Sequence, residues 1–92
     1  MKLADDIREF AYREYIKPAR DQSLHEVTIR TGDVHDKMGL SGRLPAVCGA
    51  IGTGVFEKKY RVTITKRRGV TNGANVFFTL LLINDQRSSI IK

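Results

Sequence analysis

The segment from Asn75 to Ile83 constrains the fold of this chain more than any other. Apolar side chains alternate onto both of its faces, with Val76, Phe78, Leu80 and Leu82 on one and Phe77, Leu81 and Ile83 on the other. A strand with this pattern is usually central in its sheet or covered on both sides. We therefore expect the segment to have a strand along each edge, or cover on each face.

Two shorter segments, His25–Arg30 and Arg61–Lys66, predict the neighbouring strands. In each of them apolar β-branched side chains fall on one face and polar side chains on the other, which is typical of half-buried strands. Between the second segment and the apolar strand, Arg67–Ala74 contains two glycines and the pair Asn72-Gly73. These are turn residues, so the sequence predicts a hairpin with a basic loop.

Apolar residues at spacings of three and four predict helices in the rest of the chain. The first spans about Ala4–Ile16, and Pro18 is expected to end or kink it near residues 16–17. The second is short, about Gly32–Met38, with Thr31 placed as its N-cap and Gly39 as a left-handed C-terminal cap.

A third helix is expected from Gly42 or Arg43 to about Ile51, with Ser41 as its N-cap and Pro45 tolerated in its first turn. It should fray or bend near Gly52. Its predicted core-facing residues are Leu44, Val47, Cys48 and Ile51, and its predicted exposed residues are Ala46, Gly49 and Ala50. A further helical turn is expected to include Val55, Phe56 and Tyr60.

The predicted fold class is therefore α+β, with three helices and a small antiparallel sheet. The order is helix, strand, helix, tight turn, helix, strand, loop, strand. A length of 92 residues is that of one domain, so we expect a single domain over 1–92, with 84–92 as a loose tail.

The positive charge is concentrated in the second half of the chain. Residues 41–68 carry a balance of +6, equal to the net charge of the whole chain. A one-sided basic surface favours a polyanionic partner, whereas its alternative is a solvated face without a ligand. The seven basic residues, against Glu57 alone, are Arg43, Lys58, Lys59, Arg61, Lys66, Arg67 and Arg68.

Other features narrow the environment and the chemistry. The N-terminus lacks the apolar stretch of a signal peptide and no apolar run is long enough to span a bilayer, so we expect a cytoplasmic protein without membrane contact. Cys48 is the single cysteine and is expected to be a buried structural thiol. His35 and its neighbours Asp33 and Asp36 do not share a helical face. With no clustered carboxylates in the basic half, no enzyme, metal, cofactor or small-molecule substrate is expected.

The turn Met38-Gly39-Leu40-Ser41 between two predicted helices, followed by a basic hairpin, resembles the winged helix-turn-helix superfamily. The resemblance covers nearly the whole chain. It implies a double-stranded DNA partner, a recognition helix from Ser41 to Gly52 and a wing from Arg67 to Ala74. The segment Thr28–Leu40 is similar to small prokaryotic domains beside restriction and mobile-element genes, which favours a prokaryotic or viral origin.

From the resemblance and the charge map together, we expect a transcriptional regulator or an accessory DNA-binding module, nucleoid-associated when bound. Arg43 would meet base edges or phosphate, and Ser41 would bind phosphate or only cap its helix. The recognition helix has few long polar side chains, so it should discriminate weakly between sequences. The residues expected to bind nucleic acid are Ser41, Arg43, Lys58, Lys59, Arg61, Lys66, Arg67, Arg68 and Asn72.

The alternative hypothesis is a winged-helix protein-interaction or architectural module. It would act through Phe77, Leu81 and Ile83, if the sheet leaves them uncovered. The tail Ile90-Ile91 or the first helix would cover this face, within the chain or in a homodimer. RNA is a weaker candidate because the basic residues include no aromatic stacking platform in the sequence.

Overall fold

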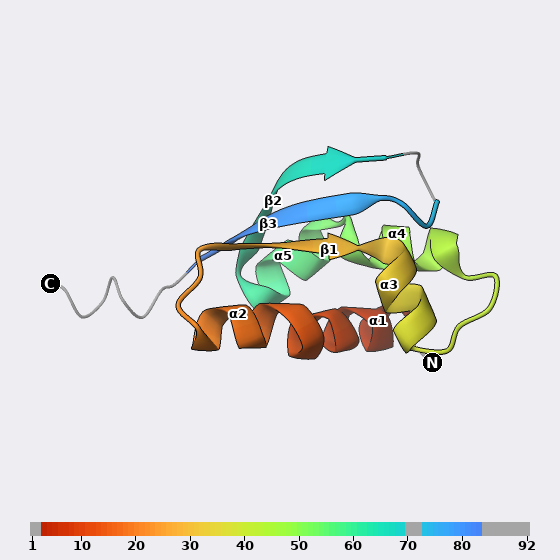
Figure 1. Cartoon of the computed structure of the whole chain (residues 1–92), viewed down its shortest axis with the longest axis horizontal. Coiled ribbons are helices and arrows are strands. Elements are labelled where there is room, and N and C mark those ends of the chain that lie inside the picture. Colours follow the sequence, from red (N-terminus) through yellow and green to blue (C-terminus); the bar gives the residue numbers. More distant parts are fainter. Residues whose placement is uncertain (1–2, 70–72, 84–92) are drawn as a thin grey trace, which may run out of the picture.

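A computed structural model describes residues 3–69 and 73–83 and shows within them an α+β arrangement of four helices and a small antiparallel sheet (Figure 1). The first helix is continuous through three segments. In chain order the elements are α1 (Leu3–Ala11), η1 (Tyr12–Ile16), α2 (Lys17–Asp21), β1 (Glu26–Arg30), α3 (Thr31–Lys37), α4 (Leu44–Ile51), α5 (Gly54–Tyr60), β2 (Val62–Arg68) and β3 (Phe77–Leu82). The predicted α+β class is confirmed, but α5 is a fourth helix where three were predicted. The predicted tail, 84–92, lies outside the described residues.

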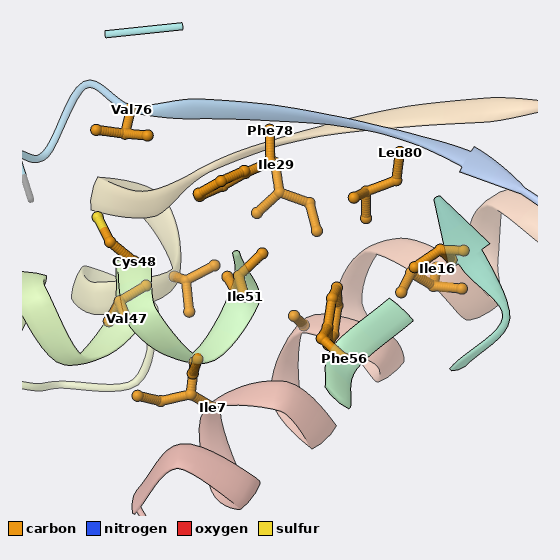
Figure 2. Packing of buried hydrophobic residues seen from close by; sticks show 14 of the residues in the cluster. Ile7, Ile16, Ile29, Val47, Cys48, Ile51, Phe56, Val76, Phe78 and Leu80 are labelled. Atoms are coloured by element: carbon orange, nitrogen blue, oxygen red, sulfur yellow. The ribbon is translucent and has the colours of Figure 1, made fainter. Parts of the chain in front are cut away.

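The apolar strand is central, as predicted. β3 pairs antiparallel with both β1 and β2, in the order β1-β3-β2. On the inner face of the sheet, Ile29, Phe78 and Leu80 are fully buried and point toward the helices (Figure 2). On the outer face, Phe77 and Leu81 are exposed, so the helices cover only one side of the sheet.

A β-bulge lies in β2 between Ile64 and Lys66. The pairs of β2 with β3 are Val62–Leu82, Thr63–Leu81, Ile64–Leu80, Lys66–Thr79, Arg67–Phe78 and Arg68–Phe77. Since paired residues share a face of the sheet, the extra residue Thr65 reverses the alternation. Arg67 therefore faces the helices, whereas Lys66 and Arg68 face outward. The predicted loop starting at Arg67 is wrong, because β2 continues through Arg68.

The first helix does not end near residues 16–17 but continues through Pro18 to Asp21, so its predicted end is wrong. The segment η1 is π-helical, and the N–H of Lys17 donates to the carbonyl of Tyr12, five residues earlier. Pro18 follows this π-helical segment as the second residue of α2. The wide turn also keeps Ala11 and Ile16, five residues apart, on the buried face.

The end of α3 confirms Gly39 as a left-handed cap. Gly39 has φ of +70°, and the N–H groups of Gly39 and Leu40 donate to the carbonyls of Asp36 and His35 (both 3.0 Å). This is the Schellman arrangement, in which the positive φ favours glycine. The chain then leaves α3 toward α4.

The start of α3 is held differently from the prediction. Thr31 is buried, and its Oγ1 donates to the carbonyl of Gly73 (2.8 Å) instead of capping the helix. The N–H groups of Thr31 and Gly32 donate to the carbonyls of Val76 and Ala74 (both 2.9 Å). The backbone that leads into β3 therefore satisfies two of the four N–H groups that are free at the start of a helix.

Ser41 was predicted to be the N-cap of α4, and this prediction is wrong. Gly42 has φ of +64° and delays the helix, so the N-cap is Arg43, without a side-chain capping bond. The backbone N–H of Arg43 donates to Nε2 of His35 (3.2 Å). A side chain of α3 thus supplies the acceptor that Ser41 was expected to supply. Pro45 stands in the first turn, as predicted.

The inner layer packs around α4 (Figure 2). Val47, Cys48 and Ile51 are buried, as predicted, whereas Leu44 is only half-buried. Ala50 was predicted to be exposed and is buried. Ala50 is inward because α1 lies against this side of α4, where Nε of Arg8 donates to the Ala50 carbonyl (2.9 Å). Phe56 of α5 is fully buried as well. The helix ends at Ile51, next to Gly52 as predicted.

Candidate nucleic-acid interface

The turn between α3 and α4 carries the first two predicted contact residues. Ser41 and Arg43 are both exposed. Arg43 is fixed through its backbone by His35, whose Nδ1 also lies 3.5 Å from a carboxylate oxygen of Asp36. This hydrogen bond to α3 anchors the backbone at the start of α4, and Arg43 itself is exposed to solvent.

The second group of predicted residues lies around the end of α5. Lys58 and Lys59 are exposed in the last turn of that helix, and Lys59 Nζ lies 5.6 Å from the ring centroid of Tyr60. Arg61 follows with φ of +55° and ends α5 in the left-handed conformation. Its carbonyl accepts bonds from Ile83 N–H (3.0 Å) and the Arg20 guanidinium (2.8 Å).

The third group stands at the far end of β2. Lys66, Arg67 and Arg68 are exposed. They lie five to seven residues beyond Arg61 of the α5 group, roughly 16 to 23 Å along the strand at about 3.3 Å per residue. The guanidinium carbon of Arg67 lies 5.1 Å from the ring centroid of Phe78, on the helix side of the sheet. Asn72 lies outside the described residues. The other predicted contact residues therefore fall into three groups, at the α3–α4 turn, at the end of α5 and at the far end of β2.

The turn before α4 and the β2–β3 hairpin lie at the same end of the molecule (Figure 1). Arg43 belongs to the first and Arg67 to the second. In α4 itself, the solvent-exposed positions are Pro45 and Gly49, with Ala46 half-buried. The exposed side of this helix therefore carries small side chains, and Arg43 precedes its first turn.

Arg30 was not predicted as a site residue, and Phe77 was predicted only as part of the apolar face of a protein-interaction module. Phe77 pairs with Arg30 of β1 on one side and with Arg68 of β2 on the other. These residues are far apart in the sequence, and the sheet register alone makes them neighbours. The alternation in residues 25–30 put Arg30 on the polar face, but no local signal could indicate which residue of β3 lies beside it.

Two other arginines are occupied with holding the fold together. The side chain of Arg8 bridges Ala50 of α4 and Asp5 of α1. One terminal nitrogen of Arg20, Nη2, lies within hydrogen-bond distance of the carbonyls of Tyr60, Arg61 and Ile83 (2.7, 2.8 and 3.2 Å). Charge-assisted bonds of this kind are the stronger ones in proteins, so these two cations serve the packing of the first helix.

Within residues 3–69 and 73–83, His, Cys, Asp and Glu side chains form no group of three that could hold a metal ion. In the same part of the chain, none of the helices has both the length and the apolar character needed to cross a membrane. Comparison with protein-family models, with curated proteins and with solved structures found no match.

Proposed function

We propose that this domain binds duplex DNA as a winged helix-turn-helix, with α4 against the major groove and the β2–β3 hairpin as the wing. The observation that carries the proposal is the placement of the α3–α4 turn and the hairpin at one end of the molecule (Figure 1). In a helix-turn-helix, the N-terminal residues of the second helix meet the base edges. Here that position belongs to Arg43, and Arg67 stands on the helix side of the hairpin.

The electrostatics of this region support a phosphate-rich partner. Lysine and arginine contacts to phosphates supply most non-specific affinity for DNA, through the release of counterions. Glu57, the single acid in residues 41–68, is occupied internally, because its Oε2 accepts the N–H of Ile64 (2.8 Å). The carboxylate keeps its charge, and the seven lysines and arginines of residues 41–68 still exceed it by six.

The surface of α4 supports weak sequence discrimination. Pro45 and Gly49 offer no side-chain donor or acceptor to base edges, and only Arg43 at the start of the helix could take a guanine in a bidentate manner. Small side chains permit a close approach of the helix to the groove, but they read few bases. We infer a regulator or an accessory DNA-binding module that depends on charge and shape more than on sequence.

The proposal is tested by fluorescence anisotropy of a labelled DNA duplex at several salt concentrations. The double variant Arg43→Ala/Arg67→Ala should lower the slope of log affinity against log salt by roughly 1.8, because each lost phosphate contact accounts for about 0.9. The matched control is Lys58→Ala/Lys59→Ala, which removes the same charge from the α5 group. We expect the control to retain most of the slope.

Two results would contradict the proposal. If the wild-type protein does not bind duplex DNA at low salt, duplex binding by this domain is ruled out. If the two double variants lose the same slope, the duplex does not prefer the end of the molecule that holds the α3–α4 turn and the hairpin. Circular dichroism of each variant verifies that the fold is retained.

A further inference from the structure

The outer face of the sheet carries an exposed aromatic ring between two arginines. In antiparallel strands, paired residues hold their side chains on one face, with Cβ atoms roughly 5 Å apart. The register gives three rows across β1, β3 and β2, which are Arg30–Phe77–Arg68, Thr28–Thr79–Lys66 and Glu26–Leu81–Thr63. Phe77 therefore lies between two arginine residues in one row, and Lys66 stands in the adjoining row.

Phe77 and Leu81 are both more exposed than large apolar residues of a core, at 36% and 44%. Arg68 and Lys66 are exposed beside them. Glu26 is the single acid among the strand residues of the three rows. The outer face thus combines an apolar patch with positive charge. Arg30 is paired with Asp33, whereas a neutral apolar partner would leave Lys66 and Arg68 without counter-charge.

Arg30 is held in place before any ligand arrives. Its Nε and Nη2 donate to Oδ1 of Asn75 (3.0 and 2.9 Å), and its Nη1 donates to Oδ1 of Asp33 (2.7 Å). Asn75 lies two residues before Phe77, and Asp33 belongs to the first turn of α3. A guanidinium fixed at both edges loses little freedom on binding, so this side of the ring is preorganised.

We propose that the outer face binds single-stranded DNA, with one base stacked on Phe77 and the adjacent phosphates on Arg68 and Lys66. Aromatic side chains that stack on bases, next to cations that follow the backbone, are the common means of holding single strands. A duplex does not fit this face, because its bases are already stacked on one another. The ligand must therefore offer an unstacked base together with a phosphate from the adjacent nucleotide.

The charges also argue against a second copy of the chain. Two outer faces packed together would bring Lys66 and Arg68 toward the same cations of the second copy, and like charges brought together repel. The choice of DNA over RNA rests on the proposed function. Because of the bulge, Arg67 faces the proposed duplex and its neighbour Arg68 faces outward, so a strand that leaves the duplex at the hairpin would reach the outer face.

The first test measures binding of a labelled oligo-dT of about 12 nucleotides, a length within the usual site sizes. Phe77→Ala should weaken binding about tenfold, as expected for the loss of one stacked base. Leu81→Ala is the matched control, because it removes another exposed apolar side chain from the same face of the same strand. It should change the affinity less than twofold. Equal effects of the two variants would overturn the proposal.

The second test uses Phe77→Trp. The chain contains no tryptophan, so the emission of this variant reports on the one position. Saturation with oligo-dT should quench the emission by stacking, whereas Leu81→Trp should be quenched much less. Unchanged emission of Phe77→Trp at saturation would show that no base stacks there. An oligo-rU that binds more tightly and quenches more strongly would assign the face to RNA and overturn the choice of DNA.

The two proposals fail in different experiments. Loss of duplex binding in the wild type, with Phe77-dependent binding of oligo-dT retained, removes the proposed function and leaves the single-strand site. Duplex binding that is unaffected by Phe77→Ala, together with no binding of oligo-dT, removes only the single-strand site. A Phe77-dependent dimer in sedimentation, without binding of oligo-dT, would show that a second copy occupies the face and would overturn this inference.

Discussion

The two faces of β3 are built from similar side chains and have opposite surroundings. On the inner face, Phe78 and Leu80 have no exposed surface, whereas on the outer face Phe77 and Leu81 are exposed at 36% and 44%. The difference lies in the helices, which stand on one side of the sheet (Figures 1 and 2). An apolar pattern therefore predicts that a strand is central, but which face is covered depends on the elements around it.

The largest expected difference between the faces is in stability. Phe78→Ala should lower the free energy of unfolding by about 3–5 kcal/mol, because it leaves a cavity between the sheet and α4. Phe77→Ala should cost about 1 kcal/mol or less, because the ring is already partly in water. Urea denaturation of both variants measures the two values. Similar losses would show that the outer face is covered in solution.

A smaller effect is expected where α3 meets the segment that enters β3. A Cβ atom on Gly32 would lie 2.7 Å from the carbonyl oxygen of Ala74, so Gly32→Ala should destabilise the fold by roughly 1–3 kcal/mol. Gly49→Ala is the control, because a Cβ atom there has no neighbour within 4 Å. It should stabilise α4 by about 0.5–1 kcal/mol. Thermal unfolding should therefore show a lower midpoint temperature for Gly32→Ala and a higher one for Gly49→Ala.

The smallest expected effect distinguishes two adjacent arginines of β2. Arg67→Ala should reduce the salt slope of duplex binding by about 0.9 and leave oligo-dT binding nearly unchanged. Arg68→Ala should do the reverse, with a reduction of about 0.7 for the single strand. Salt titrations of both variants with both ligands give four slopes. If each variant affects both ligands alike, the bulge does not separate two binding faces.

Much of the fold follows from local pattern. Alternation located the three strands, and the apolar strand of residues 75–83 was correctly placed at the centre. Gly39 was identified as a cap because a left-handed residue after a short helix favours glycine. The features that were wrong depend on contacts between distant parts of the chain. His35, and not Ser41, accepts the backbone N–H at the start of α4. The hydroxyl of Thr31 donates to the carbonyl of Gly73 and does not cap α3.

The candidate sites were less predictable than the fold. The basic residues could be listed from the sequence, but the bulge at Thr65 determines which of them face the helices and which face outward. Thr65 itself has no sequence signal that marks a bulge. Phe77 went unnoticed as a stacking residue because its arginine neighbours come from β1 and β2, and only strand pairing brings Arg30 beside it.

The single thiol of the chain lies at the junction of α4 with the start of β3. Cys48 is 3% exposed, and its Sγ is 3.9 Å from the carbonyl oxygen of Gly73. A reagent in solution reaches this sulfur only when the junction opens, so the rate of alkylation records how often α4 and the base of the hairpin separate. The alkylation rate of the buried cysteine thus measures the opening of the surface on which DNA is proposed to lie.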